Sequence, residues 1–361
     1  MRSRTSTFAC LPGSCSKVAQ NQAKWRAVLV GCGSISRAWL RAMQGRTDIE
    51  IVGMVDLVPE LAEARRQEFA LGDVPVGTDQ ARMIKDTGAR VVFDCTVPAA
   101  HPTVTLTALE LGCHVLGEKP LAPTMAEAQR MVAAAAEHDR TYAVIQNRRY
   151  MNSIIQYRDM VQSSALGQLS TVAANFFLGP RFGGFRVEMD HVLLIDMAIH
   201  SFDQARFITG RDPVSVYCHE WNPAGSWYQH GAAAFCIFEM TDDVVFSYNG
   251  SWCAEGMNNS WNCDWRSIGT GGSVVWDGEE EIRGELVTGT EGFFRAVEPM
   301  AVPPSPELQY TVHGGVINEF LTCLTAGTKP QTVCTDNIRS LAMMLGAVES
   351  AKTGRRVDIT W

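Results

Sequence analysis

Residues 27–36 read Ala27-Val28-Leu29-Val30-Gly31-Cys32-Gly33-Ser34-Ile35-Ser36, and this segment sets the architecture of the chain. Its first four residues are apolar and predict a strand, and the residues from Ser34 to Gln44 predict a helix. A glycine turn between a strand and a helix is the setting in which a G-x-G-x-x-G-like motif binds a dinucleotide. Gly31 allows the tight turn, and Gly33 lets the backbone approach a pyrophosphate that lies on the free N–H groups of the helix.

A second apolar run, from Ile49 to Val55, ends in Asp56, about 20 residues beyond the turn, where dinucleotide folds place the acid that binds the ribose hydroxyls. The next residues, 57–59, are Leu-Val-Pro, so no arginine stands there to hold a 2′-phosphate. The sequence therefore favours NAD over NADP. An ordinary strand–helix turn with an exposed aspartate is the alternative interpretation.

The composition fits a globular protein with room for two domains: 361 residues, a net charge of −8, 46% hydrophobic and 19% charged residues. The sequence has no basic block and no apolar run near the ~20 residues of a membrane span, so neither nucleic acid nor a membrane is expected as a partner. The eleven cysteines show neither a C-x-x-C motif nor Cys/His zinc spacing. We therefore expect no metal site, reduced thiols and a cytoplasmic location.

From Trp25 to about residue 148, short apolar runs alternate with helical segments, which predicts a doubly wound parallel sheet of the Rossmann type. Beyond Arg149 one long helix, about His191 to Thr209, is followed by strand-like runs without long helices between them. This pattern predicts an α/β domain with an open, mainly antiparallel sheet. Residues 284–310 are predicted to be a loop. We expect a disordered tail at residues 1–24, a dinucleotide-binding domain at 25–148 and a substrate-binding domain at 149–361.

Ligands of open α/β sheets bind beyond the carboxyl ends of the strands, and three polar clusters follow predicted strands. They are Thr96-Val97-Pro98 with His101, Glu118-Lys119-Pro120, and Asn147-Arg148-Arg149. For the first cluster a polar loop without function is an equal alternative. A lysine at a strand end, directly before a proline, is an unusual choice for a simple loop, so the second cluster is the stronger candidate.

The long helix carries Asp196, His200 and Asp203 among residues that are nearly all apolar. Spacings of four and three place these side chains on one helical face, so a charged stripe is expected to face something specific. A core histidine held by an aspartate of the same helix is the alternative. The neighbouring dinucleotide domain favours a functional role.

These motifs occur in an order and at spacings that together resemble the Gfo/Idh/MocA family, the relatives of glucose–fructose oxidoreductase and inositol dehydrogenase. The resemblance runs from about Trp25 to near the C-terminus. It implies a Rossmann domain, a second domain whose open sheet often mediates oligomerisation, tightly bound NAD(P), and a pyranose or polyol substrate. The chain departs from the family pattern at Ser36, which replaces Gly or Ala, and at residues 188–194, where many members have a glycine-rich approach.

The implied enzyme is an NAD(P)-dependent dehydrogenase that acts on a CH–OH group of a sugar, sugar acid or cyclitol. His200 would be the general base, Lys119 would stabilise the developing alkoxide, and Asp196 would orient His200 or bind an adjacent hydroxyl. The residues expected at the cofactor are Gly31, Gly33, Ser34, Ile35, Asp56, Thr96, Pro98, His101, Glu118 and Lys119. The residues expected at the substrate are Asn147, Arg148, Arg149, His191, Asp196 and His200.

Two other functions remain compatible with these residues. One is an NAD-dependent glycosidase that oxidises, eliminates and re-reduces without net NADH, and the other is a non-catalytic sugar- or NAD-binding module. The six tryptophans between residues 221 and 276 are compatible with a carbohydrate platform, with sheet packing or with a subunit interface. We expect a homodimer or homotetramer formed through this sheet.

Overall fold

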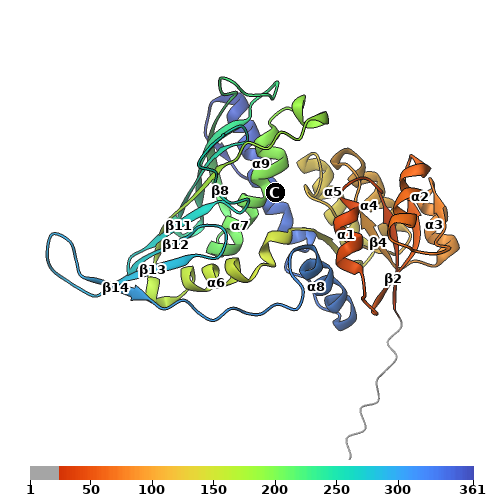
Figure 1. The fold of residues 1–361 in the computed structure, drawn as a ribbon, viewed down its shortest axis with the longest axis horizontal. Coiled ribbons are helices and arrows are strands. Elements are labelled where there is room, and N and C mark those ends of the chain that lie inside the picture. Colours follow the sequence, from red (N-terminus) through yellow and green to blue (C-terminus); the bar gives the residue numbers. More distant parts are fainter. Residues whose placement is uncertain (1–23) are drawn as a thin grey trace, which may run out of the picture.

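The computed structural model describes residues 24–361 and shows two lobes, each built on its own β-sheet (Figure 1). Apart from Lys24, the tail predicted at residues 1–24 lies outside the described residues. Within the described part of the chain, no helix has the length and apolar character needed to cross a membrane. The nine cysteines found there form no disulfide bonds with one another, whereas Cys10 and Cys15 fall outside the described residues.

The first sheet has six parallel strands in the order β3-β2-β1-β4-β5-β6. The strands are β1 (Trp25–Val30), β2 (Ile49–Val55), β3 (Val76–Gly77), β4 (Val91–Asp94), β5 (His114–Gly117) and β6 (Tyr142–Val144). The connecting helices are α1 (Ser36–Met43), α2 (Pro59–Glu68), α3 (Gln80–Thr87), α4 (His101–Glu110) and α5 (Met125–Glu137). The strand order reverses between β1 and β4, which is where doubly wound sheets bind ligands. The predicted Rossmann arrangement is confirmed.

The second sheet has nine strands in the order β14-β13-β12-β11-β7-β10-β9-β8-β15, and only the β7–β10 pair is parallel. The strands are β7 (Leu169–Phe177), β8 (Pro213–Trp221), β9 (Ala233–Met240), β10 (Val245–Ser251), β11 (Asp264–Gly269), β12 (Gly272–Trp276), β13 (Ile282–Val287), β14 (Val297–Met300) and β15 (Val357–Asp358). The helices α6 (Asn152–Val161), α7 (Ile199–Thr209) and α9 (Cys334–Thr353) cover the face turned toward the first lobe (Figure 1). The predicted open, mainly antiparallel sheet is confirmed.

Helix α8 (Val312–Ala326) belongs to the core of the first lobe although it lies late in the sequence. Its Ile317 and Phe320 side chains are buried together with Trp39 of α1 and Leu29 of β1. In Figure 1 the segment between β14 and α8 runs along the lower edge of the molecule and brings the chain back to the first lobe. The chain passes from the first sheet to the second between β6 and β7, and α8 then returns to the first lobe, so the predicted domain bounds of 25–148 and 149–361 stay a prediction.

Two predicted elements differ from the structure. The loop predicted at residues 284–310 contains strand β14 and most of β13, which pair with each other and extend the sheet beyond β12. These strands are stabilised by hydrogen bonds to adjacent strands of the sheet, and the local content of Gly, Pro and Glu does not reveal such pairing. The helix predicted from His191 to Thr209 is π-helical over Leu193–Ala198 before it continues as α7. Three of the tryptophans, Trp252, Trp265 and Trp276, are buried and pack the sheet.

Candidate functional site

The glycine turn after β1 is shaped for a close approach of a ligand. Gly31 has a φ of +88°, and a Cβ on it would lie 2.6 Å from the carbonyl carbon of Cys95, so only glycine fits. A Cβ on Gly33 would meet no atom within 4 Å, so that part of the turn faces open space. Ser36 closes the turn by donating its hydroxyl to the Gly33 carbonyl at 2.6 Å. The turn therefore fits a pyrophosphate at the start of α1.

Asp56 is fixed by two backbone amides beyond the end of β2. Its Oδ2 accepts a hydrogen bond from the Cys32 N–H at 2.7 Å, and its Oδ1 accepts one from the Val58 N–H at 2.9 Å. A cavity of about 790 Å³ lies beside it and is lined by four predicted cofactor residues: Gly31, Gly33, Asp56 and Thr96. The volume suits a nucleotide-sized ligand, and the carboxylate keeps lone pairs for the ribose hydroxyls.

His101 and Glu118 brace this region from inside. The buried ring of His101 connects two strand-end loops, with Nδ1 2.9 Å from the Pro120 carbonyl oxygen and Nε2 3.1 Å from the Thr96 carbonyl oxygen. Glu118 is also buried and accepts a hydrogen bond from the Trp39 indole at 2.7 Å. Burial raises the pKa of the Glu118 carboxyl. Both residues thus hold the loops that carry Thr96 and Lys119, and direct contact with a cofactor stays a prediction for both.

Lys119 and Asp196 join the two lobes. Lys119 lies in the loop that follows β5. Its ammonium donates to the backbone oxygen of Asp196 at 2.7 Å and to the Asp196 Oδ1 at 3.0 Å. The other carboxylate oxygen of Asp196 accepts from Arg186 Nε at 2.5 Å. Burial alone would raise the pKa of Asp196, but Lys119 and Arg186 together hold it below its ordinary value. Asp196 is therefore a carboxylate that fixes the Lys119 ammonium in place.

His200 follows Asp196 by four residues, and no hydrogen bond joins the two side chains in the described structure. The intervening backbone is π-helical, with wider turns than an α-helix, and the Asp196 oxygens bond to Lys119 and Arg186 instead. The Nδ1 of His200 is buried without a hydrogen-bond partner among the described residues. Burial, with the positive charges of Arg148 and Lys119 nearby, holds the pKa of His200 well below 6.5. Its imidazole is therefore neutral near pH 7 and able to accept a proton.

Asn147 and Arg148 reach the same region from the loop after β6. The Asn147 amide nitrogen lies 3.2 Å from Nδ1 of His313, while its Oδ1 is buried with no partner in residues 24–361. Arg148 donates to the backbone oxygen of Trp261 and lies 3.4 Å from the Met197 sulfur. Burial also lowers the pKa of His313 to about 4, so this second imidazole is neutral as well. The unpartnered Asn147 Oδ1 and the unpartnered His200 Nδ1 are groups to which a polar ligand could hydrogen-bond.

Arg149 and His191, both predicted to bind substrate, are engaged elsewhere. Arg149 is buried and binds both carboxylate oxygens of Asp203, at 2.6 and 2.7 Å, and Asp336 at 3.0 Å. Arg149 and Asp203 thus form a structural ion pair, because nearly all the donor capacity of the guanidinium is used inside the protein. His191 Nδ1 is paired with Glu220. The two aspartates that were predicted to lie on one helical face therefore have different partners: Asp196 binds Lys119, and Asp203 binds Arg149.

Two residues at this junction, Arg186 and His313, were absent from the sequence prediction, and Trp261 entered it only as one of the six tryptophans of a possible carbohydrate platform. Arg186 ends the motif Phe182-Gly183-Gly184-Phe185-Arg186, and an arginine beside two glycines and two aromatics is a signal that the sequence does contain. His313 gives no local signal, because only the return of α8 to the first lobe brings it next to Asn147.

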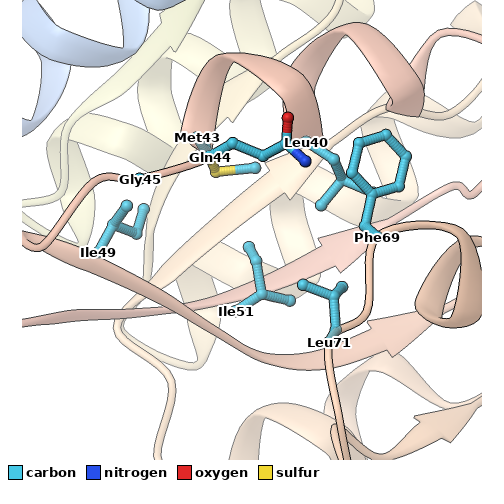
Figure 2. A pocket seen from close by; sticks show the side chains of 8 residues that line it. All are labelled: Leu40, Met43, Gln44, Gly45, Ile49, Ile51, Phe69 and Leu71. Atoms are coloured by element: carbon cyan, nitrogen blue, oxygen red, sulfur yellow. The ribbon is translucent and has the colours of Figure 1, made fainter.

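A separate hollow of about 260 Å³ lies between α1, β2 and the end of α2 (Figure 2). Its lining is Leu40, Met43, Gln44, Gly45, Ile49, Ile51, Phe69 and Leu71. Figure 2 shows that Gln44 supplies the only side-chain nitrogen and oxygen in this group. The hollow includes none of the predicted site residues and no titratable side chain, so we do not regard it as the catalytic site.

Comparisons with known proteins match both domains. The model of an oxidoreductase family with an NAD-binding Rossmann fold matches residues 25–146, and the model of the GFO/IDH/MocA C-terminal domain matches residues 154–275. A 1,5-anhydro-D-fructose reductase from Ensifer adhaerens is 24% identical over 341 residues, 92% of this chain and 97% of that protein.

Solved structures share the whole fold. An oxidoreductase from Agrobacterium radiobacter, in complex with NAD+, L-tartaric acid and magnesium, has a TM-score of 0.81 at 19% identity and covers 93% of this chain and 98% of its own. A myo-inositol 2-dehydrogenase from Lactobacillus plantarum has a TM-score of 0.76 at 22% identity and covers 94% and 100%. The predicted fold class is confirmed, and the domain that contains the glycine turn and Asp56 is an NAD-binding domain.

Proposed function

The chain belongs to the Gfo/Idh/MocA family of NAD-binding oxidoreductases, and on this basis we propose which reaction it catalyses and with which residues. The reaction is the transfer of a hydride between a secondary alcohol of a sugar, sugar acid or cyclitol and the nicotinamide of NAD. The names of several relatives support this substrate class, among them 1,5-anhydro-D-fructose reductase, D-glucoside 3-dehydrogenase and inositol 2-dehydrogenase.

One observation carries the proposal: an ammonium group from the NAD-binding domain and an imidazole from the second domain converge at one place. Lys119 is held there by Asp196, and its charge is among those that lower the pKa of His200. A fixed cation beside a neutral, unpartnered histidine is the pair of groups that oxidation of an alcohol requires.

In the proposed mechanism, bound NAD supplies the hydride acceptor, and the protein manages the proton and the charge. His200 takes the hydroxyl proton of the substrate, since its low pKa keeps the imidazole neutral. Lys119 donates a hydrogen bond to the same oxygen as negative charge develops on it. Asp196 positions Lys119, and Asn147 offers its unpartnered Oδ1 to a hydroxyl or amide of the ligand.

The proposal includes assembly of copies of the chain through the outer face of the nine-stranded sheet. On β8 and β9 the side chains alternate, so that Cys236 and Phe238 are buried whereas Tyr217, Phe235 and Ile237 are 44–53% exposed. Tyr217 and Ile237 are direct cross-strand partners, which makes the exposed apolar surface continuous. Such a face is typical of a protein–protein interface.

Activity assays on two variants test the reaction. Lys119→Ala and His200→Ala should each abolish NADH formation from a panel of aldoses, sugar acids and cyclitols, while calorimetry still detects NAD binding. Full activity in either variant removes the role given to that residue. Cleavage of a glycoside without net NADH would identify the glycosidase reaction instead, and NAD binding with no turnover of any substrate would indicate a binding module.

A further inference from the structure

Arg148 is a cation without a counter-ion at the junction of the two domains. Its guanidinium donates to the uncharged backbone oxygen of Trp261 and approaches the Met197 sulfur at 3.4 Å. Within residues 24–361 it forms no ion pair. Asp264, the acid closest to Trp261 in sequence, is already bound by the amides of Asn175 and Asn259, each at 2.7 Å. Arg148 is half-buried and has no counter-ion in the described protein, so an anionic ligand can provide one.

Arg186 presents a second guanidinium at the same junction. Its Nε binds Asp196, and its plane lies over two aromatic rings, 5.0 Å from the Phe182 centroid and 4.8 Å from the Phe185 centroid. The two rings hold the side chain in place, and its two terminal nitrogens make no hydrogen bond to the described protein. Asp196 is therefore shared between Arg186 and Lys119, which leaves this group of cations undercompensated.

An aromatic wall connects the two arginines. The Phe182 ring, under Arg186, lies 6.2 Å from the Trp261 ring, and Trp261 is the residue whose backbone oxygen holds Arg148. Around this wall three cations, Lys119, Arg148 and Arg186, face one ionised acid, Asp196. The imidazoles of His200 and His313 are neutral, because burial lowers the pKa of both. One further acid, Glu118, lies 3.9 Å from His313 Nε2, and burial raises its pKa, so three cations face at most two carboxylates. The junction thus carries an excess of positive charge and has free guanidinium donors.

We propose that the substrate is a sugar or polyol that carries a carboxylate, and that Arg148 and Arg186 bind this carboxylate while the reacting hydroxyl lies at Lys119 and His200. The inference rests on the dehydrogenase function proposed above and specifies its substrate. A guanidinium is planar and presents paired N–H donors that match the two oxygens of a carboxylate, which a neutral hydroxymethyl group does not offer. The carboxylate would supply the counter-ion that Arg148 lacks.

Matched pairs of substrates test this specificity in the NAD-loaded enzyme. D-Glucose with D-glucuronate, and D-galactose with D-galacturonate, differ only in a hydroxymethyl or a carboxylate at C6. We expect kcat/KM for the acid to exceed that for the neutral sugar by at least about 10-fold. Arg186→Gln should lower kcat/KM for the acid by about 10- to 100-fold, mainly through KM, with a much smaller effect on the neutral sugar. Arg148→Gln should do the same.

Two further variants sharpen the test. Arg186→Lys keeps the charge but loses the paired donors, so it should recover only part of the preference for the acid. Arg181→Gln is the matched control, because Arg181 lies in the same loop but pairs with Glu255 at the surface, and it should keep the wild-type preference. If Arg148→Gln fails to fold, the Arg186→Gln variant still tests the proposal, because Arg186 is partly exposed.

Several results would overturn the carboxylate site while leaving the dehydrogenase intact. The first is a kcat/KM for the neutral sugars that equals or exceeds the value for the acids. The second is a loss of kcat/KM in Arg186→Gln that is the same for both members of a pair, which would mean that Arg186 acts only through Asp196. If no compound yields NADH, calorimetric titration of the NAD-loaded protein with D-glucuronate, D-gluconate and tartrate decides. Binding that is lost in Arg186→Gln supports the site although the proposed reaction fails, and the absence of any acid binding refutes it.

Discussion

Replacing Arg149 by methionine should destabilise the protein strongly and should change its affinity for substrate little. The guanidinium joins Asp203 and Asp336, and Asp203 is nearly fully buried, with Ser340 as its other partner at 2.7 Å. Arg149→Met keeps much of the apolar stem but leaves the Asp203 carboxylate with one neutral donor. Breaking a buried pair by removing one partner costs about 3–5 kcal/mol, so we expect a loss of that size in the free energy of unfolding.

Urea unfolding followed by tryptophan fluorescence measures this loss, and steady-state kinetics on the folded variant measures KM. Arg181→Met is the control for stability, because its pair with Glu255 is exposed and should contribute at most about 1 kcal/mol. The double variant Arg149→Met/Asp203→Leu removes both charges and should recover part of the loss. A loss below about 1 kcal/mol for Arg149→Met, together with a large rise in KM, would show that Arg149 binds substrate after all.

Other predictions concern the cofactor, the base and the assembly. Because burial and nearby cations lower the pKa of His200, its imidazole stays unprotonated as the pH falls, and kcat/KM should decline only below about pH 6.5. With a neutral substrate, Arg148→Met should raise the pKa of His200 and move the decline in kcat/KM to higher pH. An unchanged pH profile in this variant would contradict the role of Arg148. Gly33→Ala should leave the unfolding midpoint unchanged but weaken NAD binding in calorimetry, since the new methyl group enters the space of the pyrophosphate. Asp56→Ser should raise the Kd of NAD about 10-fold and reduce the difference in affinity between NAD and NADP, because the charged acceptor for the ribose hydroxyls is lost. Ile237→Glu should reduce the particle mass measured by light scattering, and the same mass for both proteins would exclude the outer face as the interface.

The sequence predicted the features of the fold that local pattern controls. The glycine turn, Asp56 and the alternation of short strands with helices specify the first sheet, because each depends on residues close together in the chain. Strand β14 escaped prediction since its pairing with β13 extends a sheet assembled from distant segments. The π-helical segment also escaped, because the spacing of Asp196 and His200 is equally compatible with an α-helix.

For the site, the structure shows which predicted residues lie together and how they pair, while their functional roles stay predictions. Lys119, Asp196 and His200 come together as a group, but the partner of Asp196 is Lys119 from the other domain, which no spacing within one helix can show. Arg148 and Arg149 are neighbours in sequence, yet one is left without a counter-ion and the other is bound by two carboxylates. Two adjacent side chains in a short turn point in different directions, so charge type alone could not separate a ligand-binding arginine from a structural one.

The path of α8 explains why the site depends on both domains at once. Val316, Ile317 and Phe320 of α8 are buried in the core of the NAD-binding domain, so this domain includes a helix that follows the whole second sheet in the sequence. The same helix carries His313, whose ring contacts Asn147 at the end of the first domain. A change in the relative position of the two lobes therefore has to move both chain crossings, at residues 147–152 and 301–311, and with them the Lys119–Asp196 contact. The distance between Lys119 and His200 is thus set by the packing of α8 as much as by the loop that carries Lys119 and the helix that carries His200.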